Sequence, residues 1–246
     1  MDYKIFKNTI SKKSSDKLFD FILKCCHFYC PSIFSRSEKF KDKWDDHLFN
    51  TKLILFRKKN KKKFSAMYNS IQISNEIAKF VYTNNFSSIA KKTLKVQENE
   101  LLVRAPGLRM DFPNDTRNSY GWHQDNAYDQ YNLSSKNGIV IWSPLIDTDF
   151  NNGTLIIKKG SYNHSFSSSR LEKTGSNLRS KQILVKKKYL KKYNSETINV
   201  KKNSSVVIYS GLFHKSGKNI SDKVRFTVLI RFNKLLSKDF KYFRNL

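Results

Sequence analysis

No stretch of this sequence is long and apolar enough to form a membrane span. A transmembrane helix needs about 20 consecutive apolar residues, and polar or charged residues interrupt every apolar run well before that length. The first residues, Met1-Asp2-Tyr3-Lys4, also lack the apolar core of a secretory signal peptide. These absences argue against a membrane-spanning or secreted protein and predict a cytoplasmic one.

Cysteine is scarce, and its three copies lie close together. Cys25, Cys26 and Cys30 surround His27 in an otherwise apolar segment, residues 19–30. A zinc site is one interpretation, but structural zinc usually draws on two separated pairs of ligands, and the sequence has no second pair. We therefore expect a buried helix with reduced thiols.

Acidic residues are also few. The chain has 20 Asp and Glu against 47 Lys and Arg, which gives a net charge of +27, as in many proteins that bind nucleic acid or acidic membranes. However, lysine greatly outnumbers arginine, no nucleic-acid-binding motif is present, and the lysine-rich runs at residues 57–63 and 186–192 contain few aromatics. Nucleic acid is therefore the less favoured partner. The runs are either solvated surface left by compositional drift or a source of attraction for an anionic small-molecule substrate.

The most informative segment is Trp122-His123-Gln124-Asp125. Alternate side chains of an extended strand point the same way, so His123 and Asp125 share one face. With His214 from a distant strand, they would form the two-histidine, one-carboxylate set that binds non-haem Fe(II) and leaves positions open for oxygen chemistry. The alternative is a surface His and Asp plus an unrelated core histidine, because His-x-Asp triplets also arise by chance.

An arginine follows His214 after a short segment. Residues 224–232 have the β-branched and aromatic content of a strand whose even positions are all large and apolar, so Arg225 points to the other face. A buried arginine requires an anion. That anion is either the carboxylate of a dicarboxylate co-substrate, with Ser216 adding a hydroxyl donor, or an Asp or Glu of the chain itself.

These segments together resemble the phytanoyl-CoA dioxygenase (PhyH-like) family of Fe(II)/2-oxoglutarate-dependent oxygenases. The resemblance covers residues 101–232 and depends on the order and spacing of three motifs: Trp122 to Asp125, Asn152-Gly153-Thr154-Leu155 with Gly160-Ser161, and His214-x-Ser216-x-x-Asn219-x-Ser221 through Arg225. The chain departs from the family pattern only in turns and substrate-side loops, at Lys159, Tyr162 and Asn203-Ser204. It retains every metal ligand.

The resemblance implies an enzyme that uses Fe(II), 2-oxoglutarate and O2. His123, Asp125 and His214 would hold the metal, and the far carboxylate of 2-oxoglutarate would lie on Arg225 and Ser216. The expected reaction is hydroxylation of a small-molecule, carrier-linked, lipid-linked or saccharide-linked substrate, with release of succinate and CO2. A jelly-roll module that binds without turnover is the alternative, against which the complete ligand set argues.

Three further residues are candidates for the co-substrate pocket: Trp142, Arg109 and Asp111. Trp142 would form a wall beside the metal or simply belong to the core. Arg109 and Asp111 alternate with apolar neighbours and share a face, where they either line the carboxylate pocket or pair with each other.

The character of the sequence changes near residue 95. Residues 1–95 carry helix-like segments, residues 96–235 contain short strands separated by Asn, Gly and Ser turns, and residues 236–246 form a tail. We expect a single domain, mainly β with flanking α: a double-stranded β-helix (jelly roll, cupin-like) with the N-terminal helices packed outside. The expected strands are residues 101–104, 138–142, 154–157, 182–185, 197–200, 205–209 and 224–232. Residues 163–181 have no clear pattern and are expected to form a mobile loop over the open end, with His164 as a substrate contact.

Overall fold

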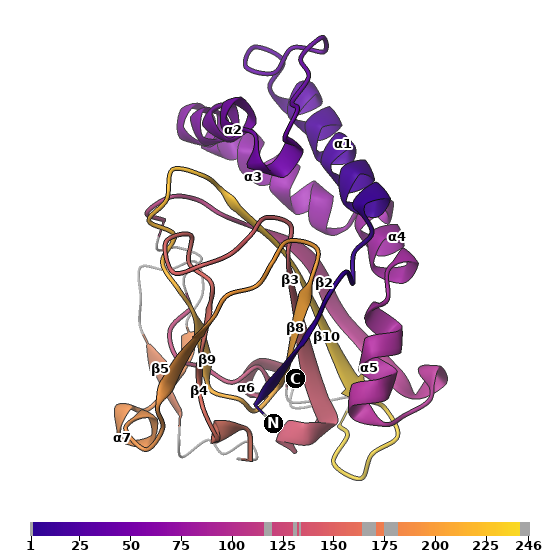
Figure 1. Ribbon diagram of the computed structural model, residues 1–246, viewed down its shortest axis with the longest axis vertical. Coiled ribbons are helices and arrows are strands. Elements are labelled where there is room, and N and C mark those ends of the chain that lie inside the picture. The colour runs from indigo at the N-terminus through magenta and orange to yellow at the C-terminus, as the bar shows by residue number, and fades with distance from the viewer. Residues whose placement is uncertain are drawn as a thin grey trace.

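The protein folds into three layers, in which helices cover one face of a large sheet and a smaller sheet faces the other (Figure 1). The structure is a computed structural model and describes residues 2–115, 120–129, 132, 134–163, 171–174 and 182–241. Its helices are α1 (Lys12–Tyr29), α2 (His47–Lys59), α3 (Lys61–Gln72), α4 (Asn75–Thr83), α5 (Phe86–Leu94), α6 (Asn126–Asp129) and α7 (Lys187–Leu190). Its strands are β1 (Tyr3–Phe6), β2 (Leu101–Asp111), β3 (Gly138–Pro144), β4 (Leu155–Lys158), β5 (Leu171–Thr174), β6 (Gln182–Val185), β7 (Ser195–Ile198), β8 (Ser205–Tyr209), β9 (His214–Ser216) and β10 (Arg225–Lys234). In the described ranges, no helix is long and apolar enough to cross a membrane.

The large sheet has the order β1-β8-β3-β10-β2, the small sheet has the order β7-β4-β9, and all paired strands are antiparallel. Strands β5 and β6 form a separate hairpin. Side chains alternate along a strand, so the even positions of residues 226–232 on β10 face the helices and the odd positions face the small sheet. Strand β3 divides in the same way, with Ile141 in the helix-side core and Trp142 in the core between the sheets. Both faces of the large sheet are therefore covered, as the sequence of β10 predicts.

The N-terminal helices begin at polar residues that cap them. A side-chain oxygen accepts a hydrogen bond from a first-turn N–H at Ser11 for α1, Asp46 for α2, Asn60 for α3 and Ser74 for α4. This layer packs on β10, where the rings of Trp44 and Phe49 have centroids 4.8 and 6.0 Å from that of Phe226. The Asn50 side chain also accepts a hydrogen bond from the N–H of Val224 at 2.8 Å. The helices thus fix the start of β10, the strand that carries Arg225.

The three cysteines lie in and directly after α1 as free thiols. Cys26 is fully buried, with its sulfur 3.8 Å from the sulfur of Met67 on α3. Burial raises the pKa of the Cys26 thiol far above its ordinary value, so the thiol stays protonated and unreactive in the folded protein. This segment therefore packs α1 against α3, as the expected buried helix does.

Helix α3 covers the outer edge of β2. The side-chain amide of Gln72 donates to the carbonyl of Leu108 and accepts from its N–H, both at 3.0 Å. These two bonds take the place of a neighbouring strand. Because exposed sheet edges invite pairing with other chains, this contact also protects the edge.

The expectation of a mainly β, jelly-roll fold with flanking helices is confirmed. Two strands were not predicted, β1 and β5, whereas β9 is the strand that was expected to carry His214. Strands β1 and β9 are short and form by pairing with distant segments, β1 with β8 and β9 with β4. Residues 171–174 form β5, where the sequence predicts a loop. Asn163 ends a short 3-10 turn, and the rest of that predicted loop, residues 164–170 with His164 and residues 175–181, lies outside the described residues.

Candidate active site

His123 and His214 face each other across one pair of backbone hydrogen bonds. The N–H of His123 donates to the carbonyl of His214 at 3.0 Å, and the N–H of His214 donates to the carbonyl of His123 at 3.1 Å. Residues paired in this way carry their side chains on the same side of the ribbon, and the two imidazole centroids lie 4.1 Å apart. The sequence predicts a strand around His123, but the structure forms only this isolated bridge, and Asp125 lies in the turn that leads into α6.

The chain holds both imidazoles in the same tautomer. Nδ1 of His123 lies 2.8 Å from the carbonyl oxygen of Gly121, and Nδ1 of His214 lies 2.9 Å from that of Leu212. A carbonyl oxygen can only accept, so each Nδ1 carries the proton and each Nε2 presents a lone pair. Burial, together with the neighbouring His214, lowers the pKa of His123 to about 3. His123 is therefore neutral at physiological pH, and its Nε2 can bind a metal ion.

Asp125 completes the cluster. Its Oδ2 is buried, makes no hydrogen bond within the described part of the chain, and lies 3.2 Å from Nε2 of His214. Two atoms that both present lone pairs are unfavourable neighbours at this distance, and a cation between them removes the conflict. The ligand atoms of His123, Asp125 and His214 all lie within 4.8 Å of one another. This set fits a first-row transition metal and matches the two-histidine, one-carboxylate arrangement of non-haem Fe(II) proteins.

Arg231, which the sequence motifs do not single out, holds the other oxygen of Asp125. Its Nε donates to Oδ1 at 2.7 Å. Burial alone would raise the pKa of Asp125, but the positive charge of Arg231 opposes burial, and the pKa lies well below its ordinary value. Asp125 is therefore ionised, with Oδ2 left to face the imidazoles. The signal that could have found Arg231 is its position on the same odd-numbered face of β10 as Arg225.

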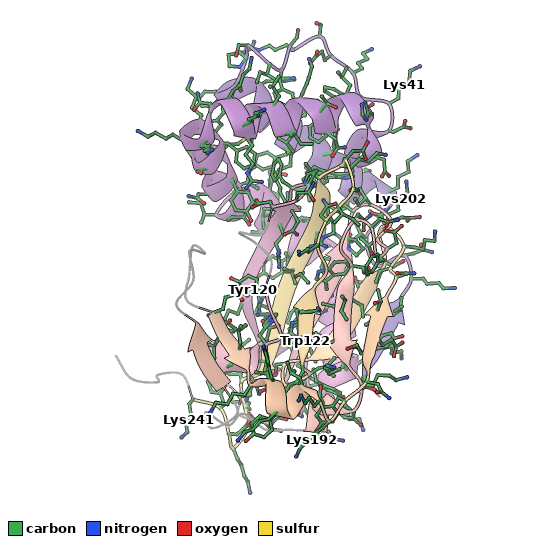
Figure 2. The ribbon with its side chains drawn as sticks, turned by 90° about the vertical axis from the view of Figure 1, so that its left-hand side faces the viewer. Lys41, Tyr120, Trp122, Lys192, Lys202 and Lys241 are labelled. Carbon is green, nitrogen blue, oxygen red and sulfur yellow. The ribbon has the colours of Figure 1, made fainter. Side chains whose placement is uncertain are left out.

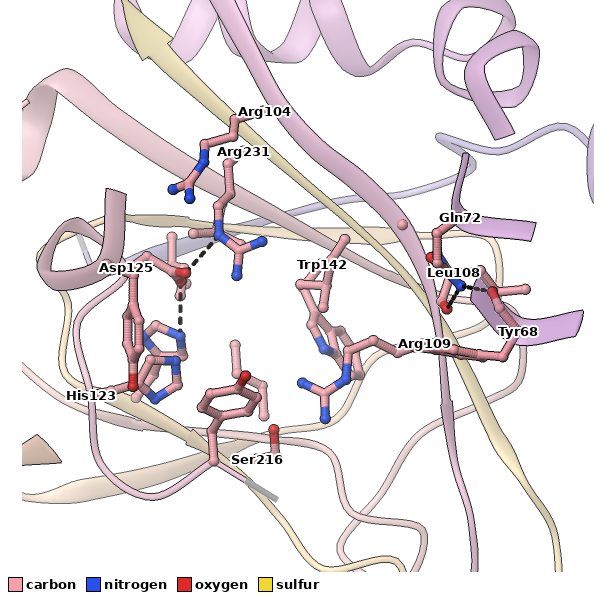
Figure 3. A pocket seen from close by; sticks show the side chains of 18 residues that line it. Tyr68, Gln72, Arg104, Leu108, Arg109, His123, Asp125, Trp142, Ser216 and Arg231 are labelled. Carbon is pink, nitrogen blue, oxygen red and sulfur yellow. Dashed lines mark hydrogen bonds and ion pairs between the residues drawn. The ribbon is translucent and has the colours of Figure 1, made fainter. Parts of the chain in front are cut away.

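A cavity of about 380 Å³ opens between the two sheets beside this cluster (Figure 3). In the close-up, His123 and Asp125 lie on one side and Arg109 lies on the other. The apolar part of the wall includes Val140, Trp142, Leu155, Ile208 and Leu229. Three arginines line the same cavity, Arg104, Arg109 and Arg231, whereas Asp125 is the one carboxylate among the described residues of the wall. The cavity therefore has a positively charged lining.

A bulge in β2 turns Arg104 toward the cavity. Between the paired positions Leu229–Gly107 and Arg231–Arg104, β2 contains one residue more than β10. With regular alternation, Arg104 would point toward the helices, because it lies an odd number of residues from Gly107. Pro106 belongs to this extra stretch and has no N–H to donate, which suits a place where the ladder is interrupted.

Asp111 binds two arginines. Its Oδ1 accepts from Nη2 of Arg109 at 2.7 Å, and its Oδ2 accepts from Nη2 of Arg225 at 2.8 Å. Arg225 also donates to the carbonyl of Asn152 at 3.1 Å. Burial alone would raise the pKa of Asp111, but the two guanidinium groups outweigh it and lower the pKa, so the carboxylate is ionised. The strand register produces this cluster, because it places Arg225 directly opposite Asp111.

The predicted co-substrate residues fall into two groups. Arg109, Ser216 and Trp142 line the cavity, whereas Arg225 and Asp111 do not. Arg225 is 1 % exposed, and its guanidinium lies 5.9 Å from the ring of Trp142. Arg109 and Asp111 pair with each other, and Arg109 also faces the cavity. A contact between Arg225 and a co-substrate stays a prediction.

Several solved structures share this fold. They include the epimerase SnoN in complex with Fe3+, α-ketoglutarate and nogalamycin RO, with 9% identity, a TM-score of 0.58 and coverage of 95% of this chain and 79% of that chain. EctD from S. alaskensis with bound Fe has 12% identity, a TM-score of 0.57 and coverage of 99% and 78%. AviO1 from Streptomyces viridochromogenes Tue57 has 13% identity, a TM-score of 0.55 and coverage of 98% and 93%. At such low identities these similarities show the fold alone.

Sequence comparisons identify the family. No curated protein matches the sequence. The family model for phytanoyl-CoA dioxygenase (PhyH), however, matches residues 34–227, a span that contains all three members of the His-Asp-His cluster. This match covers more than half of the chain and agrees with the resemblance seen in the motifs, so the protein belongs to the phytanoyl-CoA dioxygenase (PhyH) family.

Proposed function

We propose that the protein is an Fe(II)- and 2-oxoglutarate-dependent oxygenase that hydroxylates a small molecule, with release of succinate and CO2. The observation that carries the proposal is the convergence of three ligand atoms, from His123, Asp125 and His214, at the wall of a cavity. Membership of a dioxygenase family supports it. So does the fold shared with SnoN and EctD, whose structures contain iron, with α-ketoglutarate in the case of SnoN.

The metal would be held by Nε2 of His123, Nε2 of His214 and Oδ2 of Asp125. Bound Fe(II), together with 2-oxoglutarate and O2, would supply the oxidation of a substrate C–H bond. The chain itself prepares the ligands, because the carbonyls of Gly121 and Leu212 keep both imidazoles in the metal-binding tautomer. Three protein ligands leave room for small ligands on the cavity side.

The co-substrate would place its far carboxylate at the end of the cavity formed by Arg109 and Ser216. A guanidinium pairs strongly with a carboxylate, and a serine hydroxyl can donate to the same group. Arg225 would add a second positive charge behind this end of the cavity, because Asp111 forms ion pairs with both Arg225 and Arg109. The ring of Trp142 and its apolar neighbours would keep this end of the cavity dry.

We further propose that the substrate carries an anionic group, a carboxylate or a phosphate. Arg104 and Arg231 are paired across β2 and β10, and both line the cavity near the metal ligands. Two cations placed opposite each other make this wall attractive to an anion. The volume of about 380 Å³ suits a small molecule.

Two other functions have less support. A module that binds without turnover would have no need for two histidines held in one tautomer beside an ionised carboxylate. A nucleic-acid-binding protein would gather its lysines on one surface. In Figure 2 the labelled lysines instead lie far apart, with Lys41 near one end of the molecule and Lys192 and Lys241 near the other.

The test is to load the purified protein with Fe(II) under anaerobic conditions and then add 2-oxoglutarate, O2 and metabolite fractions. We expect binding of about one Fe(II) per chain and succinate release that a substrate-containing fraction stimulates. His214→Ala should remove both. The control is His47→Ala, because His47 lies on the surface near Asp222 and should not affect either measurement. Full Fe(II) binding by His214→Ala would refute the proposed site.

A further inference from the structure

A carboxylate of the chain already binds Arg225, the arginine that the family resemblance assigns to the co-substrate. Asp111 is 7 % exposed and Arg225 is 1 % exposed, and their ion pair at 2.8 Å is buried behind the cavity wall. Among the described residues, the other hydrogen-bond partner of the Arg225 guanidinium is the carbonyl of Asn152, the guanidinium lies 5.9 Å from the ring of Trp142, and its Nε has no hydrogen-bond partner. Any ligand carboxylate that approaches Arg225 therefore meets the negative charge of Asp111.

The same carboxylate is shared with Arg109, which faces the cavity. The three side chains carry two positive charges and one negative charge, so their net charge is +1. Without Asp111 the net charge would be +2. A single carboxylate is thus the anion that balances this cluster.

We infer that Asp111 sets the affinity of this end of the cavity for the co-substrate by supplying an internal carboxylate that competes for Arg109 and Arg225. The inference rests on the proposed use of 2-oxoglutarate. Asp111 compensates the charges of both guanidinium groups when the cavity holds no anion, and it weakens the binding of an anion that arrives. Because of Asp111, a group with a single negative charge can bind at this end of the cavity and leave again.

An Asp111→Asn replacement separates the two effects of Asp111. Asparagine retains the shape of the side chain and one oxygen that can accept from an arginine, but it removes the charge. Repulsion between two carboxylates in a buried site is strong, since charges interact more strongly there than in water. Loss of this repulsion should outweigh the loss of the ion pairs with Arg109 and Arg225, and 2-oxoglutarate should bind roughly tenfold more tightly.

The experiment is calorimetric titration of 2-oxoglutarate into Mn(II)-loaded protein, which reports binding without turnover. The proteins compared are the wild type, Asp111→Asn and Asp115→Asn. Asp115 is a matched control because it also forms an ion pair with an arginine, Arg57, but neither residue lines the cavity. Asp115→Asn should bind 2-oxoglutarate as the wild type does, while Asp111→Asn should bind it more tightly.

The rise in unfolding temperature on adding 2-oxoglutarate gives a second readout, which a purely structural role of Asp111 would not change. Without ligand, Asp111→Asn should unfold at a lower temperature than the wild type, because the buried cation Arg225 and the half-buried cation Arg109 have lost their anion. Saturating 2-oxoglutarate should raise the unfolding temperature of this variant by more than it raises that of the wild type. An equal or smaller rise would count against the inference.

Equal or weaker 2-oxoglutarate binding by folded Asp111→Asn would overturn the inference. If that variant does not fold, the double variant Arg109→Gln/Asp111→Asn removes one charge of each sign and leaves Arg225 with the original net charge of +1. It should bind 2-oxoglutarate within several-fold of the wild type, and loss of binding would overturn the inference. Failure of the wild type itself to bind 2-oxoglutarate would instead refute the proposed function, so the two failures are distinguishable.

Discussion

Replacing Arg231 with methionine is expected to weaken metal binding without unfolding the protein. Methionine keeps an apolar stem in the cavity wall but removes the Nε that donates to Oδ1 of Asp125 at 2.7 Å. A hydrogen bond to a charged group contributes about 1.5–3 kcal/mol, and partners of metal ligands typically change metal affinity by about 10–100-fold. Because a factor of ten corresponds to about 1.4 kcal/mol, the two figures agree. We therefore expect the dissociation constant of the metal to rise roughly 10–100-fold.

An opposite effect competes with this loss. Arg231 is a cation beside a cation-binding site, so its removal also relieves repulsion. Titration with Co(II), followed by its absorption spectrum, measures which effect is larger and does not depend on turnover. The matched control is Arg109→Met, which removes a cavity arginine that binds Asp111 instead of a metal ligand. Tighter or unchanged metal binding in Arg231→Met would refute the view that Arg231 acts by fixing Asp125.

Four other perturbations have clear expected outcomes. Arg109→Met should weaken 2-oxoglutarate binding roughly 10–100-fold and leave metal affinity unchanged, because it removes the charged donor at the co-substrate end of the cavity. Calorimetry on Mn(II)-loaded protein measures this, and unchanged 2-oxoglutarate affinity would show that the co-substrate binds elsewhere. Phe226→Ala should lower the free energy of unfolding by about 3–5 kcal/mol, because the ring is fully buried between the helices and the sheet. Urea denaturation measures this, and a loss below about 1 kcal/mol would contradict the packing. Gly153→Ala should destabilise the protein by about 1–3 kcal/mol in the same assay, because φ of Gly153 is +85° and an added Cβ would lie 2.5 Å from the backbone oxygen of Gly217. Unchanged stability would contradict the strain expected at this turn. In native protein at pH 8, a thiol reagent should modify half-buried Cys25 well before Cys26, whose labelling should require unfolding, and equal labelling rates would contradict the packing of α1.

The convergence of His123, Asp125 and His214 could be predicted from short motifs and their order along the chain. His123 and Asp125 lie in one short motif, and the order of motifs along the chain supplies His214. The sequence did not predict how the two histidines are held, since the isolated bridge between them joins residues far apart in the chain. What the motif does fix is the set of donor atoms, and the structure brings the same set together.

The lining of the cavity was harder to predict, because it depends on strand register. Arg225 opposite Asp111 and Arg231 opposite Arg104 are consequences of how β2 pairs with β10. Alternation in β10 alone indicates that Arg225 is buried, but it does not tell which anion compensates it. The short strand β1 was missed for a similar reason: four residues carry too little pattern without their partner β8.

The bulge in β2 makes the two halves of this strand differ in their tolerance of changes in chain length. One residue could be deleted between Arg104 and Gly107 and leave every other side chain on its present face, because the deletion would only restore regular pairing. A deletion between Gly107 and Asp111 would invert one half of the strand relative to the other, exchanging Arg109 with an apolar neighbour. A single-residue deletion at the bulge should therefore preserve the chemistry of this wall, whereas a single-residue deletion in the second half of β2 should change it.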